Sequence, residues 1–241
     1  MGLWEKILNL LYPNTNMCLH CNDTYLFSEI KGICDSCLKK IKLTDNYCQI
    51  CGRELNDSGE EANMCTYCQK HSNYFEMARS VGIYDGLLKE LLLKFKYDHL
   101  TELKRPLAHL MYITFKYYYN IEKIDQIIPV PIHRKRFKER GYNQVELLAE
   151  ELSKYTGISI SFDISRTKDV PPLYNFAYDQ RKNLLQDSFS VKSGAYRGQS
   201  LLLIDDIFTT GATSNEISSS LKDIGGAARV IILTIATAFT Y

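Results

Sequence analysis

The distribution of cysteine limits the possible folds of this chain more than any other feature. All eight cysteines fall within residues 18–68 and form four C-x-x-C pairs, with 12, 10 and 13 residues between successive pairs. Two thiolates at this spacing hold one ion from a tight turn, and a second pair completes a tetrahedral shell, which is typical of zinc. We predict two structural Zn²⁺ sites, the first from Cys18, Cys21, Cys34 and Cys37 and the second from Cys48, Cys51, Cys65 and Cys68.

Other uses of these cysteines fit less well. A disulfide framework suits secreted proteins, and the N-terminal residues MGLWEKILNLLYPNTN do not resemble a secretory signal. His20 and His71 lie beside cysteines, but eight thiols already fill two shells, so we expect neither histidine to be a ligand. The metal supplies the folding free energy that so small a core lacks. Residues 1–72 carry seven basic and nine acidic residues, so the charge of this module does not favour DNA binding.

The composition changes after residue 72, where strands and helices begin to alternate. Alternation of this kind predicts a mainly parallel α/β sheet. Strands are expected at 78–86 (with a turn), 125–131, 158–164, 200–204 and 228–237, and helices at 86–96, 100–119, 141–155 and 211–224. Residues 165–183 are expected to form a polar loop. We divide the chain into an N-terminal helix with a double zinc ribbon, 1–72, and an α/β domain, 73–241.

The N-terminal segment 3–11 has apolar residues at helical spacing. Two interpretations are open, a membrane-surface helix and a short helix docked on the second domain, and the lack of a basic stripe favours the second. No apolar run is long enough to span a membrane, so we expect a cytoplasmic protein. Nothing in the sequence indicates an oligomeric state.

The stretch LLLIDDIFTTGATS, residues 201–214, combines a buried strand with two adjacent carboxylates and a loop of small hydroxyl residues. Ligands of parallel sheets bind where strands end, and free backbone N–H groups before a helix suit a phosphate. A phosphate would repel Asp205 and Asp206, so these acids should face sugar hydroxyls, and a ribose 5-phosphate carries both groups. Two alternatives are a simple acidic loop and an acidic pair that holds Mg²⁺ in a P-loop nucleotide hydrolase. The second is poorly supported, because the sequence contains no G-x-x-x-x-G-K-[ST] motif.

The segment IDDIFTTGAT resembles the motif of type I phosphoribosyltransferases, which bind phosphoribosyl pyrophosphate (PRPP). The resemblance implies that Asp205 and Asp206 hold the ribose hydroxyls and that Mg²⁺ bridges the ribose oxygens and the pyrophosphate. It also implies a 5-phosphate loop formed by Thr209, Thr210, Gly211, Ala212 and Thr213.

A second resemblance is to the ComF competence proteins, and it covers nearly the whole chain. It rests on PVPIHRKRFKERGYNQ at 129–144, YDQRKNL at 178–184 and KELLLKFKYDHL at 89–100. That family also has a cysteine-rich module before a phosphoribosyltransferase-like domain. The resemblance implies PRPP, single-stranded DNA and competence-machinery proteins as partners, in DNA uptake during natural transformation.

The basic run HRKRFKER at 133–140 follows a strand that should end near the PRPP motif. Three interpretations remain open: a clamp for pyrophosphate, which we favour, a groove for single-stranded DNA in which Phe137 or Tyr142 stacks on bases, and a solvated basic turn. Arg181 of the RKNL segment is the best candidate among the arginines of the following loop. The candidate anion-binding residues are therefore Arg134, Lys135, Arg136 and Arg181.

Three hypotheses for the function remain open. The first, which the ComF resemblance implies, is a PRPP-binding ComF-type protein that handles incoming single-stranded DNA. The second is an active phosphoribosyltransferase that transfers C1 of PRPP to a nitrogen nucleophile, with an acceptor that the sequence does not indicate. The third is a regulator that binds PRPP without turnover and shifts between two binding states.

Overall fold

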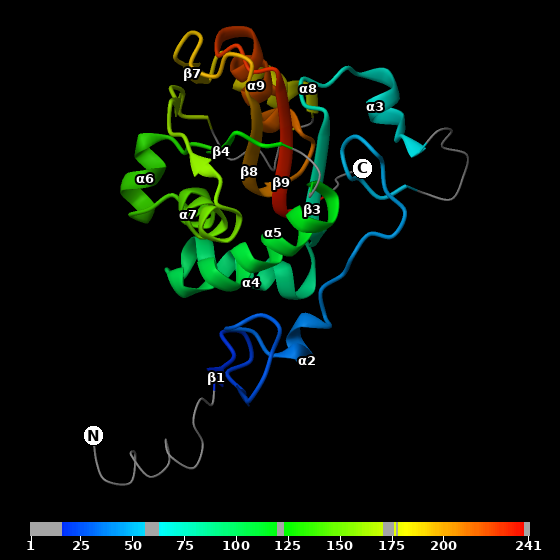
Figure 1. Cartoon of the computed structure of the whole chain (residues 1–241), viewed down its shortest axis with the longest axis vertical. Coiled ribbons are helices and arrows are strands. Elements are labelled where there is room, and N and C mark those ends of the chain that lie inside the picture. The colour runs from blue at the N-terminus through cyan, green and yellow to red at the C-terminus, as the bar shows by residue number, and fades with distance from the viewer. Residues whose placement is uncertain (1–15, 56–62, 120–122, 171–175, 177, 239–241) are drawn as a thin grey trace.

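The computed structural model describes residues 16–55, 63–119, 123–170, 176 and 178–238 (Figure 1). The helix predicted at 3–11 lies outside the described residues. The proposed boundary near residue 72 stays a prediction.

The centre of the molecule is a five-stranded parallel sheet with the order β3-β9-β8-β4-β5 (Figure 1). Its two longest strands are almost continuous apolar runs, as expected for strands buried on both faces. The strands are β3 (Met77–Ile83), β4 (Gln126–Pro129), β5 (Ser159–Ile160), β8 (Ser200–Phe208) and β9 (Arg229–Thr237). The α/β class and the parallel sheet predicted from the sequence are confirmed.

Helices connect these strands and cover the sheet. The helix α5 packs on β3 and β9, and α7 packs on β4 and β8. The apolar residues of α4 at i, i+1, i+4 and i+5 are fully buried, which explains its amphipathic pattern. The helical segments are α4 (Gly86–Tyr97), η2 (Thr101–Leu103), α5 (Lys104–Tyr119), α6 (Arg134–Arg140), α7 (Gln144–Thr156), α8 (Tyr178–Leu185), α9 (Ala212–Ser219) and η4 (Ser220–Ile224).

The N-terminal module consists of short elements around the cysteines and runs along the outer edge of the sheet (Figure 1). Its elements are β1 (Asn16–Met17), β2 (Thr24–Tyr25), α2 (Asp35–Leu38) and α3 (Thr66–Lys70). The edge strand β3 donates its Ala78 N–H to Ile50 and its Ile83 N–H to Lys42, at 2.7 and 2.8 Å. Gly82 is required there, because a Cβ would lie 2.5 Å from the Lys42 carbonyl oxygen. The module therefore covers the edge of the sheet.

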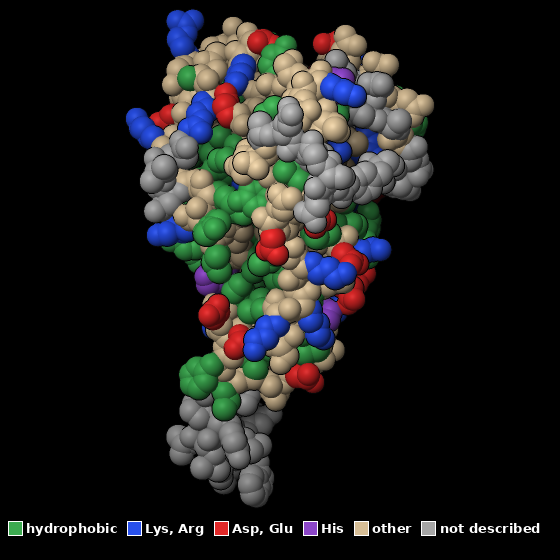
Figure 2. Space-filling view, turned by 90° about the vertical axis from the view of Figure 1, so that its right-hand side faces the viewer, with side chains coloured by type: hydrophobic (Ala, Val, Ile, Leu, Met, Phe, Trp, Pro, Cys, Tyr) green, Lys and Arg blue, Asp and Glu red, His purple; other side chains and the backbone are tan. Residues whose placement is uncertain are grey.

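Figure 2 shows this side of the molecule, where charged side chains of both signs alternate with hydrophobic areas. No large area of a single sign appears in this view, in line with the net charge of +1.

Two predicted segments differ from the structure. The strand expected at 158–164 is divided into β5 and β6 (Ile164–Arg166), because the Ser161 hydroxyl accepts the N–H of Asp163 and turns the chain. The segment 165–183, expected to be a loop, contains part of β6, which pairs with β7 (Phe189–Val191), and most of α8. The helix α8 has few apolar residues and gave no periodic signal in the sequence.

The basic run at 133–140 is also a helix, α6, rather than a turn. The ring of His133 accepts the N–H of Lys135 at its N-terminus, and Gly141 ends the helix with a φ of 81°. None of its residues is buried, so no hydrophobic periodicity marked it as helical.

Candidate functional site

The eight cysteines form two clusters, and the sequential pairing predicted from their spacing is confirmed. In each cluster the four Sγ atoms lie within 4.8 Å of one another: Cys18, Cys21, Cys34 and Cys37 in the first, and Cys48, Cys51, Cys65 and Cys68 in the second. No disulfide joins them. Sulfurs about 2.3 Å from a tetrahedral Zn²⁺ are about 3.8 Å apart. The Sγ atoms of Cys21 and Cys34 and those of Cys51 and Cys65 are both 3.7 Å apart, which is consistent with two structural zinc sites.

Polar groups around the clusters orient the thiolates. The backbone N–H of Cys34 donates to Cys18 Sγ at 3.4 Å, and the Asn73 amide donates to Cys68 Sγ at 3.6 Å. Such contacts to ligand sulfurs stabilise their negative charge. His20 is no member of the first cluster but contacts it, with its Nδ1 3.3 Å from Cys37 Sγ and its Nε2 2.7 Å from a carboxylate oxygen of Glu90 in α4. This histidine therefore links the first cluster to the α/β domain.

The strand β8 continues through Asp205 and Asp206 to Phe208, four residues beyond the predicted end. Successive side chains of a strand point to opposite faces of the sheet, so the two carboxylates have different surroundings. Asp206 is 6% exposed, and its Oδ2 accepts from Gln144 Nε2 at 2.6 Å and pairs with Lys96 Nζ at 2.9 Å. Both donors come from helices packed on one face of the sheet, so this carboxylate is held in a fixed orientation.

Asp205 is half-buried and accepts the backbone N–H of Asp206 at 2.8 Å. Burial, followed by the charge of Asp206, raises the pKa of Asp205 to about 7, whereas Lys96 and Arg166 oppose this effect. Burial also lowers the pKa of the Arg166 guanidinium, and Asp205 counteracts that. The two adjacent carboxyl groups therefore differ in their chemistry: one titrates near neutral pH, and the other is an ion-paired acceptor.

The loop after β8 leads into the N-terminus of α9. Gly211 precedes that helix with a φ of 80°, and a Cβ at this position would lie 2.8 Å from the ring of Phe208. Thr209, Thr210 and Thr213 are partly exposed, so their hydroxyls border solvent. The positive end of the helix dipole, backbone N–H groups and threonine hydroxyls occur together here. Groups of this kind are suited to bind an anion.

Arg181 reaches this loop from α8. It is 4% exposed, its Nη1 donates to the hydroxyl of Thr209 at 2.8 Å, and its Nε donates to the Phe176 carbonyl at 2.7 Å. Burial lowers the pKa of its guanidinium. A buried arginine beside a threonine-rich loop adds a fixed positive charge to the same anion-binding chemistry.

The three basic residues predicted in the run 133–140 are separated by the helical geometry of α6. Arg134 is exposed, and the ammonium group of Lys135 lies 3.5 Å from Asp169. Arg136 instead borders a cavity of about 180 Å³ that Lys96, Arg140 and His99 also line. The structure thus brings Arg136, but not Arg134 or Lys135, to the side of Asp206 and Lys96.

Two residues of this site were not identified from the sequence. Lys96 and Gln144 lie 110 and 62 positions before Asp206, in the segments 89–100 and 129–144 that carry the ComF resemblance. Lys96 lies near the C-terminal end of α4, and Gln144 is the first residue of α7. The resemblance marked the two segments, but nothing in the sequence singled out these two side chains.

Among the described residues, no helix has the length and apolar character needed to cross a membrane.

These features define a class of protein: a parallel α/β domain with an acidic strand end and a threonine-rich loop before a helix, preceded by two four-cysteine clusters. Residues 7–69 match the double zinc ribbon domain family. Competence protein F from Haemophilus influenzae is 31% identical over 214 residues, which cover 86% of this chain and 91% of that protein. The chain belongs to the competence protein F (ComF) family.

Other relatives are similar over comparable lengths. Competence protein ComFC from Bacillus subtilis is 29% identical over 88% of this chain and 86% of its own length. The DNA utilization protein YhgH from Escherichia coli K12 is 25% identical over 82% of this chain and 87% of its own length. Adenine phosphoribosyltransferase from Saccharomyces cerevisiae aligns with 58% of this chain and 78% of its own, at 15% identity and a TM-score of 0.37.

Proposed function

We propose that this chain binds PRPP with Mg²⁺ and handles single-stranded DNA that enters the cytoplasm during natural transformation. The names of the relatives support the second part, since they are competence and DNA utilization proteins. The IDDIFTTGAT motif and its geometry support the first part.

The observation that carries the PRPP proposal is the contact between Arg181 and Thr209. It joins a buried guanidinium to the loop that the motif assigns to a 5-phosphate. The loop begins three residues after Asp206, so the groups suited to a phosphate and those suited to a diol lie at one end of β8.

In this proposal each group has one role. The loop from Thr209 to Thr213, with Arg181, takes the 5-phosphate. Asp205 and Asp206 accept hydrogen bonds from the ribose hydroxyls; because Lys96 and Gln144 both contact Oδ2 of Asp206, its other oxygen is the one offered to the ligand. Arg136 offsets the charge of the pyrophosphate.

Carboxylate oxygens beside a ligand rich in phosphate oxygens are the donor set that Mg²⁺ prefers, so Asp205 fits the proposed metal. When bound, Mg²⁺ would neutralise part of the pyrophosphate charge. The residues of the chain position the sugar between the acids and the phosphate loop, and no further step is needed for a protein that binds PRPP without turnover.

The proposal is tested by calorimetric titration of the full-length, zinc-loaded chain with PRPP and Mg²⁺. Asp205→Asn should abolish the binding heat, since an amide is a weaker acceptor for two hydroxyls than a carboxylate. Asp223→Asn, which changes an exposed acid in η4, is the matched control and should bind like the wild type. Unchanged affinity of Asp205→Asn contradicts the proposed diol site.

Two further assays distinguish the phosphoribosyltransferase and the regulator from the proposed function. Release of pyrophosphate with a candidate nitrogen acceptor would identify a phosphoribosyltransferase. Binding of PRPP that changes affinity for duplex operator DNA would identify a regulator. Salt-sensitive binding of single-stranded DNA that is lost when Arg134 and Arg136 are replaced by alanine would support the proposed DNA handling.

A further inference from the structure

The helix α6 exposes a row of side chains in which positive charges and aromatic rings alternate. Arg134, Phe137 and Arg140 follow one another three residues apart, so they lie along one face of the helix. Arg140 extends the row to the neighbouring helix, because its guanidinium carbon lies 5.6 Å from the ring centroid of Tyr97, the last residue of α4. We call these four side chains the α6 row.

Both rings of the α6 row face solvent. Phe137 is the one apolar residue of α6 and is 46% exposed, and Tyr97 is 63% exposed. Arg140 lies over one face of the Tyr97 ring, which leaves the opposite face open. Single exposed aromatic residues are common on protein surfaces, so the informative feature is their alternation with cations rather than their exposure alone.

The cations of this helix are mostly without a carboxylate partner. The helix carries five basic residues and one acid, Glu139. Lys135 pairs with Asp169 at 3.5 Å, whereas the described residues provide no ion pair to the exposed side chains of Arg134 and Lys138. Arg140 donates to the neutral side chain of Gln144. This face of α6 therefore presents positive charge that the chain itself leaves unbalanced.

Tyr142, the other ring near α6, is not part of this surface. Its hydroxyl donates to the backbone carbonyl of Phe95 in α4. Its ring packs on those of Phe95 and His99, with centroid distances of 6.3 and 5.9 Å. Tyr142 thus fixes the end of α6 against the end of α4, and this contact holds the two rings of the α6 row at a defined separation.

We propose that the α6 row binds single-stranded DNA, with bases stacked on Tyr97 and Phe137 and phosphates beside the arginines. This inference rests on the proposed function and assigns the surface that holds the strand. A single strand alternates phosphates and bases along its length, and a row that alternates cations and rings matches this pattern. Arg136 faces the cavity near Lys96 instead and is not part of the row, so the strand and PRPP occupy different sides of α6.

An anionic membrane is the alternative partner, because basic helices with aromatic residues also bind lipid surfaces. It fits less well, since a helix that lies in a membrane surface buries a continuous apolar face, and Phe137 is the one apolar residue that α6 offers.

The test uses the full-length, zinc-loaded chain and measures by fluorescence anisotropy its affinity for a thymidylate dodecamer and for an abasic dodecamer. Stacking on one aromatic side chain changes base affinity about five- to a hundredfold. Tyr97→Ala and Phe137→Ala should each weaken binding of the thymidylate strand about fivefold or more. Tyr97→Phe should bind it within about twofold of the wild type, because the ring remains. The abasic strand should bind more weakly than the thymidylate strand, and equally to all these chains.

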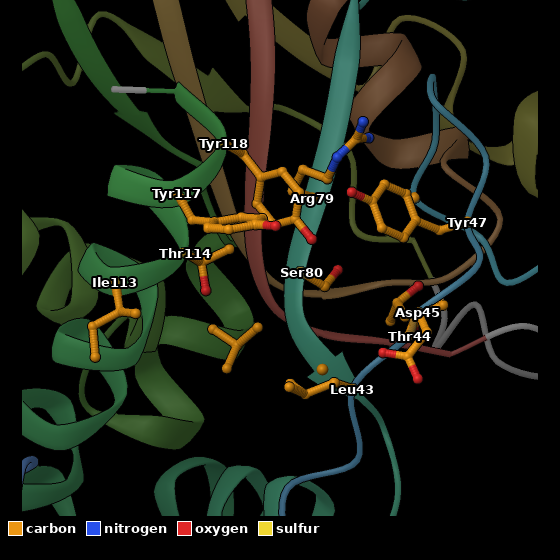
Figure 3. A pocket seen from close by; sticks show the side chains of 14 residues that line it. Leu43, Thr44, Asp45, Tyr47, Arg79, Ser80, Ile113, Thr114, Tyr117 and Tyr118 are labelled. Carbon is orange, nitrogen blue, oxygen red and sulfur yellow. The ribbon is translucent and has the colours of Figure 1, made fainter. Parts of the chain in front are cut away.

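Tyr117→Ala is the matched control. Tyr117 is 79% exposed on α5 and borders a separate cavity of about 400 Å³ beside the edge strand β3 (Figure 3). The helix α6 follows β4, which β9 and β8 separate from β3, so loss of the Tyr117 ring should leave strand binding unchanged. Tyr97 and Phe137 are exposed, so their replacement should leave the fold intact, and Phe137→Ala should bind PRPP like the wild type.

If the wild type binds the thymidylate strand and both alanine variants bind it equally well, the α6 row is not the strand surface, and the proposed DNA handling stands. If the wild type binds no single strand, the proposed DNA handling fails and the inference fails with it. Equal affinity for the abasic strand overturns the stacking. Binding of phosphatidylserine vesicles that depends on Phe137, without binding of the thymidylate strand, would identify a membrane surface instead.

Discussion

At the scale of single residues, the paired aspartates show how neighbours in the sequence acquire different properties. Asp206 is fixed by Lys96 and Gln144, whereas desolvation and the charge of Asp206 raise the pKa of Asp205 to about 7. An acid that is partly protonated at neutral pH makes ligand binding sensitive to pH in the physiological range.

The affinity for PRPP should fall as the pH falls below 7. In the proposed site the ionised carboxylate of Asp205 accepts hydrogen bonds from the ribose hydroxyls, and protonation below its pKa of about 7 would remove that acceptor. Between pH 7 and pH 5 we expect the affinity to fall by up to about tenfold per pH unit. Calorimetry over this range measures the effect, and a flat profile would contradict the assigned role.

The same shift should affect the stability of the chain without ligand. A carboxyl group with a raised pKa binds its proton more tightly in the folded state, so its stabilising effect is complete below about pH 4 and is lost as the pH rises to about 7. The side-chain amide of Asp205→Asn does not titrate, so this variant does not lose stability over that pH range. Above pH 7 this variant should be more stable than the wild type by about 1 kcal/mol or more in urea denaturation, with the two chains converging at low pH.

Lys96 provides a separate test of the orientation of Asp206. Lys96→Met keeps the length of the side chain but removes the ammonium group that pairs with Asp206. The affinity for PRPP should drop about tenfold, since a close charge contact contributes about 1–3 kcal/mol. Lys89→Met changes an exposed lysine of the same helix and should have no effect. If both variants bind equally well, Lys96 does not position the carboxylate.

At the scale of elements, the turn between β8 and α9 depends on one glycine. Gly211 has a φ of 80°, and its missing side chain makes room for the Phe208 ring. Gly198 has a similar φ of 71°, but a Cβ there would meet nothing within 4 Å. The two glycines share the conformational requirement and differ only in the close contact.

Gly211→Ala should therefore destabilise the chain by more than Gly198→Ala. The positive φ costs both variants about 1–2 kcal/mol, and Gly211→Ala must also displace the ring of Phe208 and the loop before α9. Thermal denaturation measures the difference, and PRPP titration should show a loss of affinity for Gly211→Ala alone. Equal destabilisation with intact binding would show that the loop tolerates the added methyl group.

The elements also show which features can be predicted from a sequence. The strands β8 and β9 and the helix α4 were identified because their burial produces regular apolar patterns. The pairing of the cysteines followed from spacing alone. The helices α6 and α8 were missed because they bury little apolar surface, so their residues carry no periodicity.

The candidate site was predictable where its residues are consecutive and not where the fold assembles them. The loop 209–213 and both aspartates occur in one motif, and Arg181 in another. Lys96 comes from a helix more than a hundred residues earlier, and the packing of α4 on β9, the neighbour of β8, brings it to Asp206.

At the scale of the whole molecule, the two cysteine clusters and the sheet form a connected structure. The module bonds to β3 through Lys42 and Ile50, and His20 contacts Glu90 of α4. The conformation of the module depends on its clusters, because residues 16–55 bury few large apolar side chains apart from the cysteines.

Purified chain should contain two zinc ions, which atomic absorption can measure; zero or one ion would contradict the pairing. Structural zinc sites contribute about 10–16 kcal/mol to folding, so a strong chelator should unfold residues 18–68. We expect the helical circular dichroism of the α/β domain to persist, although the chain loses the contacts to β3. A single cooperative loss of all structure would show that the two parts fold as one unit.

The cover that the module places over β3 has a consequence for cells that are short of zinc. Without its metal the module cannot hold Lys42 and Ile50 against the strand, and Ala78 and Ile83 would then offer their N–H groups to any passing polypeptide. Newly made chains would tend to self-associate before they bound any ligand. The supply of zinc would thus set the amount of correctly folded protein, independently of any ligand.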